Sequence, residues 1–303
     1  MTKAPQENSE QRPAMSRSHT ASFLVAVALL LVAGFSAADL SARGFPASGL
    51  PRPAIAPASG PPVAASASQE GLRVVVLDPG HGGSELGAVG PTGVTEKEVA
   101  LDIVRRLADL IQERLGLQVR LTRDGDFDVD LKSRAEQANN LKADVFLSIH
   151  ANAYRGKGVR GAETFFLSDK ATDDDAHRLA ALENDALDLQ SAAAGDSDLQ
   201  LLLWDMAQTL HLRESSVLAE MIQQHLNHLA GTGDRGVKQA PFRVLRGANM
   251  PAVLVEVGFL SNPDEEALLA DPDYRQQVAA ALFASLDGYR RRQALISVGS
   301  HQR

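Results

Sequence analysis

The sequence predicts an α/β fold: a mainly parallel sheet with helices on both faces, plus a helical insertion after the fourth strand. Two observations lead to this prediction. Continuous apolar runs such as residues 73–77 (RVVVL) and 252–257 (AVLVEV) are typical of parallel strands that are buried on both faces. Longer segments with apolar residues at helical spacing alternate with these runs, and such alternation indicates a parallel sheet.

The first predicted unit is a strand, a sharp loop and a helix. The strand at residues 73–77 leads directly into residues 78–83 (DPGHGG), where a proline and three glycines favour a tight loop. A helix is expected to begin at Thr95, because Thr95 and Glu98 have the spacing of a capping box, and to end at Gly116. Its apolar stripe consists of Val99, Ile103, Leu107 and Leu110.

The remaining elements continue the alternation. Strands are expected over residues 118–122, 144–149, 162–167, 242–245 and 252–257, and helices over residues 131–141, 263–269 and 274–291. Residues 171–229 are mostly helical, with a break at residues 191–195, and are too long for a single crossover between two strands. We therefore expect this block to be an insertion with a function of its own.

The N-terminal segment, residues 1–38, is typical of a secretory signal peptide. An uncharged apolar run at residues 21–35 (ASFLVAVALLLVAGF) follows Arg12 and Arg17 and precedes small residues. Because residues 21–38 are of borderline length for spanning a bilayer, a retained membrane anchor is the alternative. No twin-arginine pair is present, so we expect the general secretory route and a periplasmic or secreted protein. The start codon can correspond to Met1 or to Met15.

A linker is expected between this segment and the folded region. Residues 39–70 consist mainly of Ala, Pro, Ser and Gly, as in PRPAIAPASGPPVAASAS, a composition that buries no core. A folded domain is expected over residues 71–295, followed by a tail at residues 296–303.

Charge and cysteine content limit the chemistry. The chain has 30 Lys and Arg against 38 Asp and Glu, a net charge of −8, whereas binding to a nucleic-acid backbone requires a basic surface. No nucleic-acid partner is therefore expected. The chain contains no cysteine, so a metal ion would have to be held by histidines and carboxylates.

Four polar residues are placed where a parallel sheet binds its ligands. His81 and His150 follow or end apolar strands, Glu256 lies within one, and Glu96 lies at the start of the helix after the His81 loop. Two imidazoles and one carboxylate suit a zinc site with a position open to water, and Glu256 would be the general base. The alternative is that each histidine is a hydrogen-bonded structural residue. Glu98 is accounted for by the capping box, whereas Glu96 has no such structural reason.

Three blocks carry a family resemblance: VVVLDPGHGGSELGAVGPTGVTEKEVAL, DVDLKSRAEQANNLKADVFLSIHANA and FRVLRGANMPAVLVEVGFLSNPDEEALL. In this order they resemble the zinc-dependent N-acetylmuramoyl-L-alanine amidases of bacterial cell-wall remodelling. The resemblance implies one Zn²⁺ held by His81, Glu96 and His150, with Glu256 as the catalytic glutamate. It leaves Asn152 as a candidate for orienting the substrate or a ligand; the alternative is an ordinary turn residue.

The resemblance also implies a reaction: hydrolysis of the amide between the lactyl group of N-acetylmuramic acid and L-Ala of the peptidoglycan stem peptide, as in cell separation and wall turnover. Two alternatives remain open at this point. One is a catalytically inactive wall-binding or regulatory protein on the same fold, against which the retention of all four site residues counts. The other is a zinc peptidase that cuts within the stem peptide.

The helical insertion gains a meaning from the same resemblance. Division-associated amidases of Gram-negative bacteria resemble this chain in a helical segment that occludes the active site, supplies a glutamate to the zinc and is displaced by an activator of the LytM type. Glu183 in ALENDA is the best match for that glutamate, with Glu214 and Asp205 as alternatives. The opposing interpretation is that Glu183 is a solvated helix residue.

Overall fold

The computed structural model describes residues 71–154, 158–184, 198–229 and 233–300, without the side chains of residues 198–208 and 298–300. The predicted signal peptide (1–38), the predicted linker (39–70) and the predicted break at 191–195 lie outside these residues. None of the described helices combines the length and apolarity needed to cross a bilayer.

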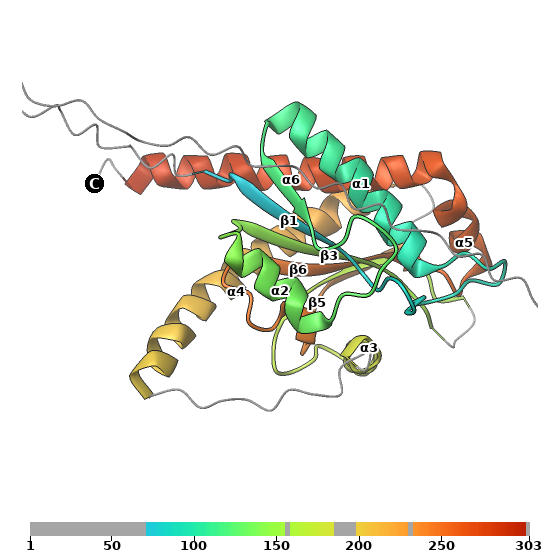
Figure 1. Ribbon diagram of the computed structural model, residues 1–303, viewed down its shortest axis with the longest axis horizontal. Helices are drawn as coiled ribbons and strands as arrows, with labels where there is room; N and C mark the ends of the chain where they lie inside the picture. Colours follow the sequence, from blue (N-terminus) through green and yellow to red (C-terminus); the bar gives the residue numbers. More distant parts are fainter. Residues whose placement is uncertain (1–70, 155–157, 185–197, 230–232, 301–303) are drawn as a thin grey trace, which may run out of the picture. The chain divides into compact units, whose positions relative to one another are not determined.

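Six strands and six α-helices account for most of the described chain (Figure 1). The strands are β1 (Val74–Pro79), β2 (Gln118–Leu121), β3 (Val145–Asn152), β4 (Ala162–Leu167), β5 (Asp234–Ala240) and β6 (Ala252–Phe259). The helices are α1 (Glu96–Leu115), α2 (Leu131–Asn140), α3 (Asp174–Asn184), α4 (Asp198–Leu226), α5 (Pro263–Ala270) and α6 (Pro272–Ser300), with a short 3-10 helix η1 (Arg243–Leu245).

The strands form one sheet in the order β2-β1-β3-β6-β4-β5. Every neighbouring pair is parallel except β4 and β6, which are antiparallel. The mainly parallel sheet is therefore confirmed. Because the carboxyl ends of β1 and β3 and that of β6 lie at the same edge, side chains that follow or end these strands are brought together there.

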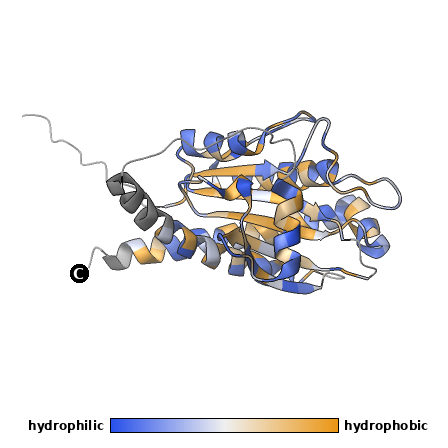
Figure 2. Cartoon of the chain, turned by 90° about the horizontal axis from the view of Figure 1, so that it is seen from below, coloured by the Kyte–Doolittle hydropathy of each residue, from blue (hydrophilic) through white to orange (hydrophobic). Residues whose placement is uncertain are grey.

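Helices cover both faces of the sheet. Val75 and Leu77 of β1 point into a core shared with α1, α4 and α6, whereas Val76 points into a second core shared with α2, α3 and η1. In Figure 1, α1 and α6 lie on one side of the strands and α2 and α3 on the other. Figure 2 shows the apolar colour concentrated in the strands between them. These two layers fix which face of the sheet each site residue occupies.

The first helix has the predicted ends but not the predicted cap. Gly116 adopts a left-handed conformation with φ of 65° and ends α1. Thr95 precedes the helix but makes no capping hydrogen bond with the backbone; its hydroxyl instead bonds the carboxylate of Glu98 at 2.8 Å. The capping-box prediction was wrong: the Thr95 hydroxyl is engaged by the Glu98 carboxylate, and the N–H groups of Glu96 and Lys97 bond carbonyl oxygens of the preceding loop.

One predicted strand is also wrong. The apolar residues Phe242, Val244 and Leu245 are buried, but they lie in and next to η1 rather than in a strand. The strand instead is β5, which is mostly polar because it lies at the edge of the sheet and pairs only with β4. Pro241 follows β5 directly, and proline has no N–H group to continue a ladder.

Two helices lie between β4 and β5, and they have different roles in the fold. The C-terminal half of α4 packs Leu218 and Ile222 into the main core, as a crossover helix between parallel strands does. α3 packs Leu179 and Ala180 against the opposite face, where the site residues point. At the C-terminus, α6 runs to Ser300, so the predicted tail at 296–303 begins inside this helix.

Candidate metal centre

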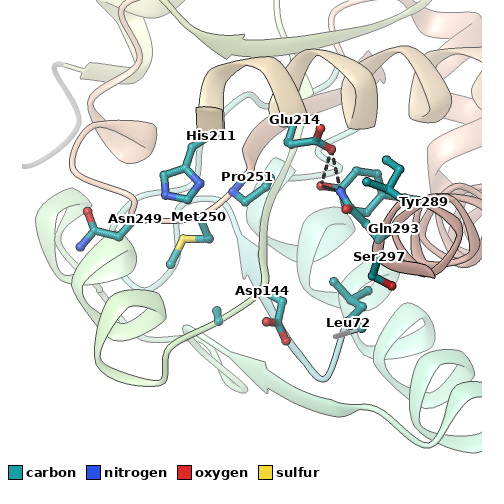
Figure 3. A pocket seen from close by; sticks show the side chains of 13 residues that line it. Leu72, Asp144, His211, Glu214, Asn249, Met250, Pro251, Tyr289, Gln293 and Ser297 are labelled. Carbon is teal, nitrogen blue, oxygen red and sulfur yellow. Dashed lines mark hydrogen bonds between the residues drawn. The ribbon is translucent and has the colours of Figure 1, made fainter. Parts of the chain in front are cut away.

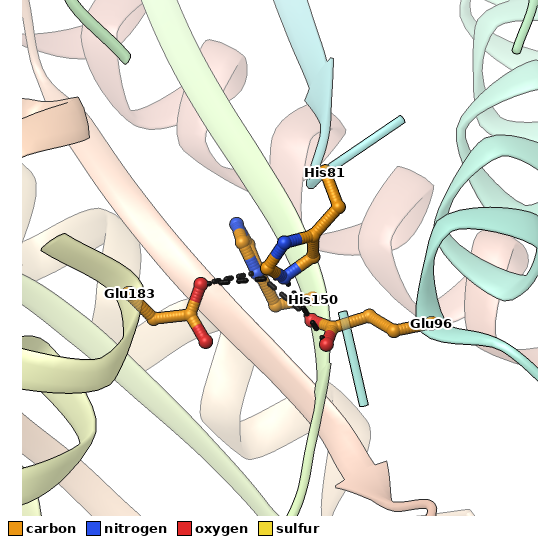
Figure 4. Close-up of side chains that lie close together, drawn as sticks. All are labelled: His81, Glu96, His150 and Glu183. Carbon is orange, nitrogen blue, oxygen red and sulfur yellow. Dashed lines mark hydrogen bonds and ion pairs between the residues drawn. The ribbon is translucent and has the colours of Figure 1, made fainter. Parts of the chain in front are cut away.

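Four side chains converge at the carboxyl edge of the sheet (Figure 4). His81 lies in the loop after β1, Glu96 is the first residue of α1, His150 lies near the end of β3, and Glu183 lies in the last turn of α3. Each offers one ligand atom, and these atoms all lie within 4.8 Å of one another. The structure thus brings together the three predicted metal ligands and the predicted occluding glutamate.

The distances within the cluster are short. Nε2 of His81 lies 3.1 Å from Oε2 of Glu96 and 3.3 Å from Oε2 of Glu183. Nδ1 of His150 lies 2.9 Å from Oε1 of Glu96 and 3.2 Å from the same Glu183 oxygen. The two imidazole rings are T-shaped with centroids 5.0 Å apart. Each histidine therefore faces both carboxylates at once.

Two buried arginines hold the loop that carries His81. Arg134 of α2 donates to the carbonyl oxygens of Pro79 and His81, both at 2.9 Å, and pairs with Asp78 at 2.8 Å. Arg123 donates to the carbonyl oxygens of Pro79 at 3.0 Å and Gly80 at 2.7 Å. These bonds stabilise His81 in a conformation with φ of 55°, which non-glycine residues adopt rarely.

Two glycines allow the backbone to approach the ligands. A Cβ atom at Gly80 would lie 2.4 Å from the His150 ring, and one at Gly87 would lie 2.5 Å from the Glu96 carboxylate. Since such distances are too short for any side chain, both positions require glycine. Glu96 itself accepts backbone N–H bonds from Ala88 at 2.7 Å and Ala151 at 3.0 Å, so its two oxygens are fixed before any ligand binds.

Glu256 lies beside the cluster rather than in it. It is the register partner of His150 on the neighbouring strand β6. Its side chain is fully buried, and neither carboxylate oxygen has a hydrogen-bond partner. Burial, reinforced by the nearby carboxylates of Glu96 and Glu183, raises the pKa of Glu256 well above its usual range. A buried carboxyl group without donors is costly for folding, which makes Glu256 a candidate functional group.

Asn152 does not contact the four-residue cluster. Its side-chain amide donates to Glu163 of β4 at 3.1 Å, and Glu163 in turn pairs with Arg235 and Lys238 of β5, each at 3.0 Å. Sequence reasoning missed Glu163, although an acidic residue inside an apolar strand is the same signal that identified Glu256. It also missed Arg123, whose only signal is a position just after a strand.

The carboxylates of the cluster shift the pKa values of its two histidines. Burial opposes a charged imidazole, but the carboxylates of Glu183 and Glu96 outweigh it and raise the pKa of His150 to about 10. The pKa of His81 is also raised, against burial, by Glu96 and Glu183. With neutral imidazoles, the two carboxylates would bring two negative charges into a buried site, and a divalent cation would balance them.

The donor set and its geometry fit a metal ion. Nε2 of His81 is buried and makes no hydrogen bond, although two carboxylate oxygens lie within 3.3 Å of it. The nitrogen and the oxygens are thus directed at a common centre rather than at one another. Imidazole nitrogen and carboxylate oxygen are ligands of zinc and related divalent metals. This cluster at the carboxyl edge of an α/β sheet is compatible with a metal site.

The site opens into two small cavities. One, of about 290 Å³, is lined by His81, Glu96 and Asn152 and by Leu182 and Glu183 of α3. The second, of about 270 Å³, shares Asn152 and Leu182 with it and extends to Arg235. α3 therefore forms a wall of both cavities.

A larger cavity of about 550 Å³ lies at the amino ends of the strands, where Leu72 and Asp144 are located (Figure 3). There Glu214 accepts hydrogen bonds from Tyr289 at 3.2 Å and Gln293 at 2.6 Å. Glu214, one alternative to Glu183, thus lies outside the metal cluster, and the side chain of Asp205, the other alternative, is outside the described residues. Among the described side chains, only the cluster of Figure 4 has the arrangement of metal ligands.

Comparison with known proteins identifies the family. Residues 75–287 match the family model described as N-acetylmuramoyl-L-alanine amidase. The chain is 38% identical over 222 residues to the N-acetylmuramoyl-L-alanine amidase AmiA of Escherichia coli, an alignment that covers 72% of this chain and 76% of that protein. The chain belongs to the N-acetylmuramoyl-L-alanine amidase family.

Solved structures agree with this assignment. The amidase AmiC2 of Nostoc punctiforme is similar with a TM-score of 0.54 and 30% identity, covering 72% of this chain and 96% of that one. The CwlD amidase of Clostridioides difficile, solved in complex with the GerS lipoprotein, is similar with a TM-score of 0.54 and 29% identity over 72% of this chain and 98% of that one.

Proposed function

We propose that the protein is a zinc-dependent peptidoglycan amidase that hydrolyses the amide between the lactyl group of N-acetylmuramic acid and L-Ala of the stem peptide. The observation that supports this most directly is the cluster of His81, Glu96 and His150 beside the unpartnered carboxylate of Glu256. Family membership supplies the substrate, and the cluster supplies the residues for the chemistry.

His81, Glu96 and His150 would hold one Zn²⁺. A zinc ion at these ligands supplies Lewis acidity, which polarises a carbonyl oxygen and makes water a stronger acid. Glu96 is held by two backbone N–H groups, so it orients the site without needing to move. Asn152 lines both cavities and is proposed to orient the substrate there.

Glu256 would act as the general base and then as the general acid. A raised pKa makes the ionised carboxylate a stronger base, and neither of its oxygens has a hydrogen-bond donor that would compete with the proton of the attacking water. The same carboxyl group would then donate that proton to the leaving amine of L-Ala. Its position next to His150 in the register of the sheet supports this role.

We also propose that α3 keeps the enzyme inactive. Glu183 lies 3.3 Å from His81 and 3.2 Å from His150, where it would occupy a ligand position that substrate or water needs. Leu179 and Leu182 of the same helix line the cavity beside the zinc ligands. A partner protein of the LytM type is proposed to displace α3 and activate the enzyme.

The location and the biological role follow from the sequence predictions. Residues 1–38 are proposed to be a signal peptide for the general secretory route, or an anchor if they are not cleaved, and residues 39–70 a linker to the catalytic domain at 71–295. The protein would then act on peptidoglycan in the periplasm, in cell separation and wall turnover.

The reaction is tested by mass spectrometry of the products from purified sacculi, with and without a chelator. The expected products are intact stem peptides with a free α-amino group on L-Ala, formed only when zinc is available. Cuts between stem residues would instead identify a peptidase, and this proposal would be wrong.

Autoinhibition is tested with Glu183→Ala in the same assay. We expect this variant to release stem peptides faster than the unaltered chain, because a ligand position becomes accessible. If both chains hold zinc and neither releases any product, the protein is a catalytically inactive member of the family.

A further inference from the structure

A pair of cations lies next to the metal centre on the edge strand β5. Arg235 and Lys238 both pair with the buried carboxylate of Glu163, each at 3.0 Å. The guanidinium of Arg235 also lies over the ring of Phe259, 5.1 Å from its centroid. The sheet thus holds both cations in place, and Arg235 has little freedom to turn away.

The sheet does not neutralise this pair. Glu163 is one carboxylate facing two cations, and the other carboxylates in contact with them come from α3 and the residue before it. Asp173 lies 3.1 Å from Lys238, and Asp175 lies 3.8 Å from Arg235. Movement of α3 would therefore leave two cations paired with one carboxylate, next to the cavity that Arg235 and Glu163 line.

One segment therefore supplies carboxylates to two places. Glu183 at the end of α3 faces the zinc ligands, while Asp173 and Asp175 at its beginning face Lys238 and Arg235. The cavity beside Arg235 and the cavity beside His81 share lining residues, among them Asn152 and Leu182. A peptide whose scissile amide lies at the zinc would extend toward Arg235 along this shared wall.

We infer that Arg235 and Lys238 form a subsite for a carboxylate of the stem peptide, and that Asp173 and Asp175 of the α3 segment occupy this subsite while the helix is docked. The inference rests on the proposed amidase function. The ligand is an acidic peptide, bound through the carboxylate of the residue after L-Ala. A guanidinium fork suits a carboxylate better than a neutral amide does.

The test uses the full, zinc-loaded chain with Asp173→Asn, Asp175→Asn and Glu183→Ala as the parent, so that carboxylates of the α3 segment block neither the zinc ligands nor the two cations. Two substrates are compared: muramoyl-L-Ala-D-isoglutamate, with a free α-carboxylate, and its α-amide. We expect the parent to prefer the carboxylate by about tenfold or more in kcat/KM, as charge-assisted hydrogen bonds do. Adding Arg235→Gln should remove this preference by slowing the carboxylate substrate alone.

A second variant and two controls keep the result interpretable. Lys238→Gln should weaken the preference independently, and Arg235→Lys should retain part of it because the charge remains. Arg246→Gln should change neither rate, since Arg246 pairs only with the exposed Asp169 on the surface described here.

Each outcome has one meaning. Equal rates for the two substrates in the parent, or equal losses for both substrates on Arg235→Gln, would overturn the subsite while leaving the amidase function intact. If the parent holds zinc and cleaves neither substrate at the lactyl amide, the proposed function fails and the subsite with it.

Discussion

Glu256 is a candidate functional residue because its burial is costly for folding. A buried carboxyl group without hydrogen-bond donors disfavours folding by several kcal/mol, so its presence points to a role in the proposed chemistry. Glu96 and Glu163 are also buried, but both have donors: backbone N–H groups for the first and β5 cations for the second. Glu256 alone among these three has none.

We expect Glu256→Gln to keep zinc and to lose activity by about 10²–10⁴-fold, the contribution typical of general acid–base catalysis. The amide has the same shape as the carboxyl group but cannot take the proton of water. Stem-peptide release and the zinc content of the purified protein are the two measurements. The matched control is Glu220→Gln, an exposed glutamate on α4. Near-full activity of the Glu256 variant would remove this residue from the mechanism.

Arg134 is a second residue whose burial matters, here for the stability of the fold. It is 2% exposed and pairs with Asp78, which is fully buried, while its other donors hold the His81 loop. We expect Arg134→Met to lower the free energy of unfolding by about 3–5 kcal/mol, because it leaves a buried carboxylate unpaired. Urea denaturation measures this.

Arg246→Met is the control for Arg134. Arg246 makes an ion pair of similar length with Asp169, 3.0 Å, but both partners are exposed. Exposed pairs contribute little to stability, so this variant should unfold at nearly the same urea concentration as the unaltered chain. An equal decrease in the free energy of unfolding in the two variants would show that the buried ion pair contributes no more to stability than the exposed one.

At the scale of residues, sequence motifs predicted the side chains of the cluster better than the surrounding side chains that position them. His81, Glu96 and His150 stand at strand ends and a helix start, and their convergence follows from a parallel sheet. Glu163 carried a local signal, but its partners Arg235 and Lys238 did not, because they lie on β5, a strand that the sequence analysis placed at residues 242–245. Contacts between distant segments have no local signal in one sequence.

At the scale of elements, polar contacts at both ends of α3 connect this helix to the rest of the domain. Its beginning is held by the ion pair of Asp173 with Lys238, and its end by Asn184, which donates to Pro241 O at 2.8 Å and accepts from Arg243 N at 2.7 Å. Because α3 has only eleven residues, these contacts at its two ends account for much of its attachment to the sheet. Weakening the contacts at either end should shift the docking equilibrium of α3 toward the undocked helix.

We expect Asn184→Ala to raise the basal rate of the enzyme by up to about tenfold, since a lost pair of hydrogen bonds corresponds to about 1–2 kcal/mol in the docking equilibrium. The measurement is stem-peptide release without an activator. Asn139→Ala is a close match: Asn139 of α2 makes the same two kinds of bond, to Gly247 O at 2.7 Å and from Asn249 N at 2.9 Å.

The Asn139 variant should lose stability but keep its basal rate, because α2 does not cover the zinc ligands. If both asparagine variants raise the rate equally, general loosening explains the effect. If neither does, Asn184 does not hold the inhibited state.

Elements with strong periodicity or apolar runs were predicted well, and those decided by long-range pairing were not. β1, β4 and β6 and the helices α1 and α2 lie within a few residues of their predicted positions. β5 was missed because its sequence, DRGVKQA, contains no apolar run, and Ala240 is its only fully buried residue. The sequence analysis instead predicted a strand at the apolar residues 242–245. In the structure these residues lie in and next to η1, where they pack in the core shared with α2 and α3.

At the scale of the whole molecule, the candidate metal centre joins distant parts of the chain. Its four side chains come from the loop after β1, the start of α1, the end of β3 and the last turn of α3. An ion that binds this arrangement binds only the folded state, because the unfolded chain does not bring these segments together. Zinc is therefore expected to stabilise the fold as well as to support catalysis.

We expect a chelator to lower the unfolding midpoint by about 5–10 °C and added zinc to restore it, since zinc at 100 times its Kd contributes about 2.7 kcal/mol. Thermal unfolding followed by circular dichroism measures this shift. His150→Ala should make the midpoint insensitive to zinc, whereas His228→Ala, at an exposed histidine on the residues just after α4, should keep the full response. A midpoint that the chelator leaves unchanged in the unaltered chain would mean that these four side chains hold no stabilising ion, and the cluster would then have to be held together by protonated histidines alone.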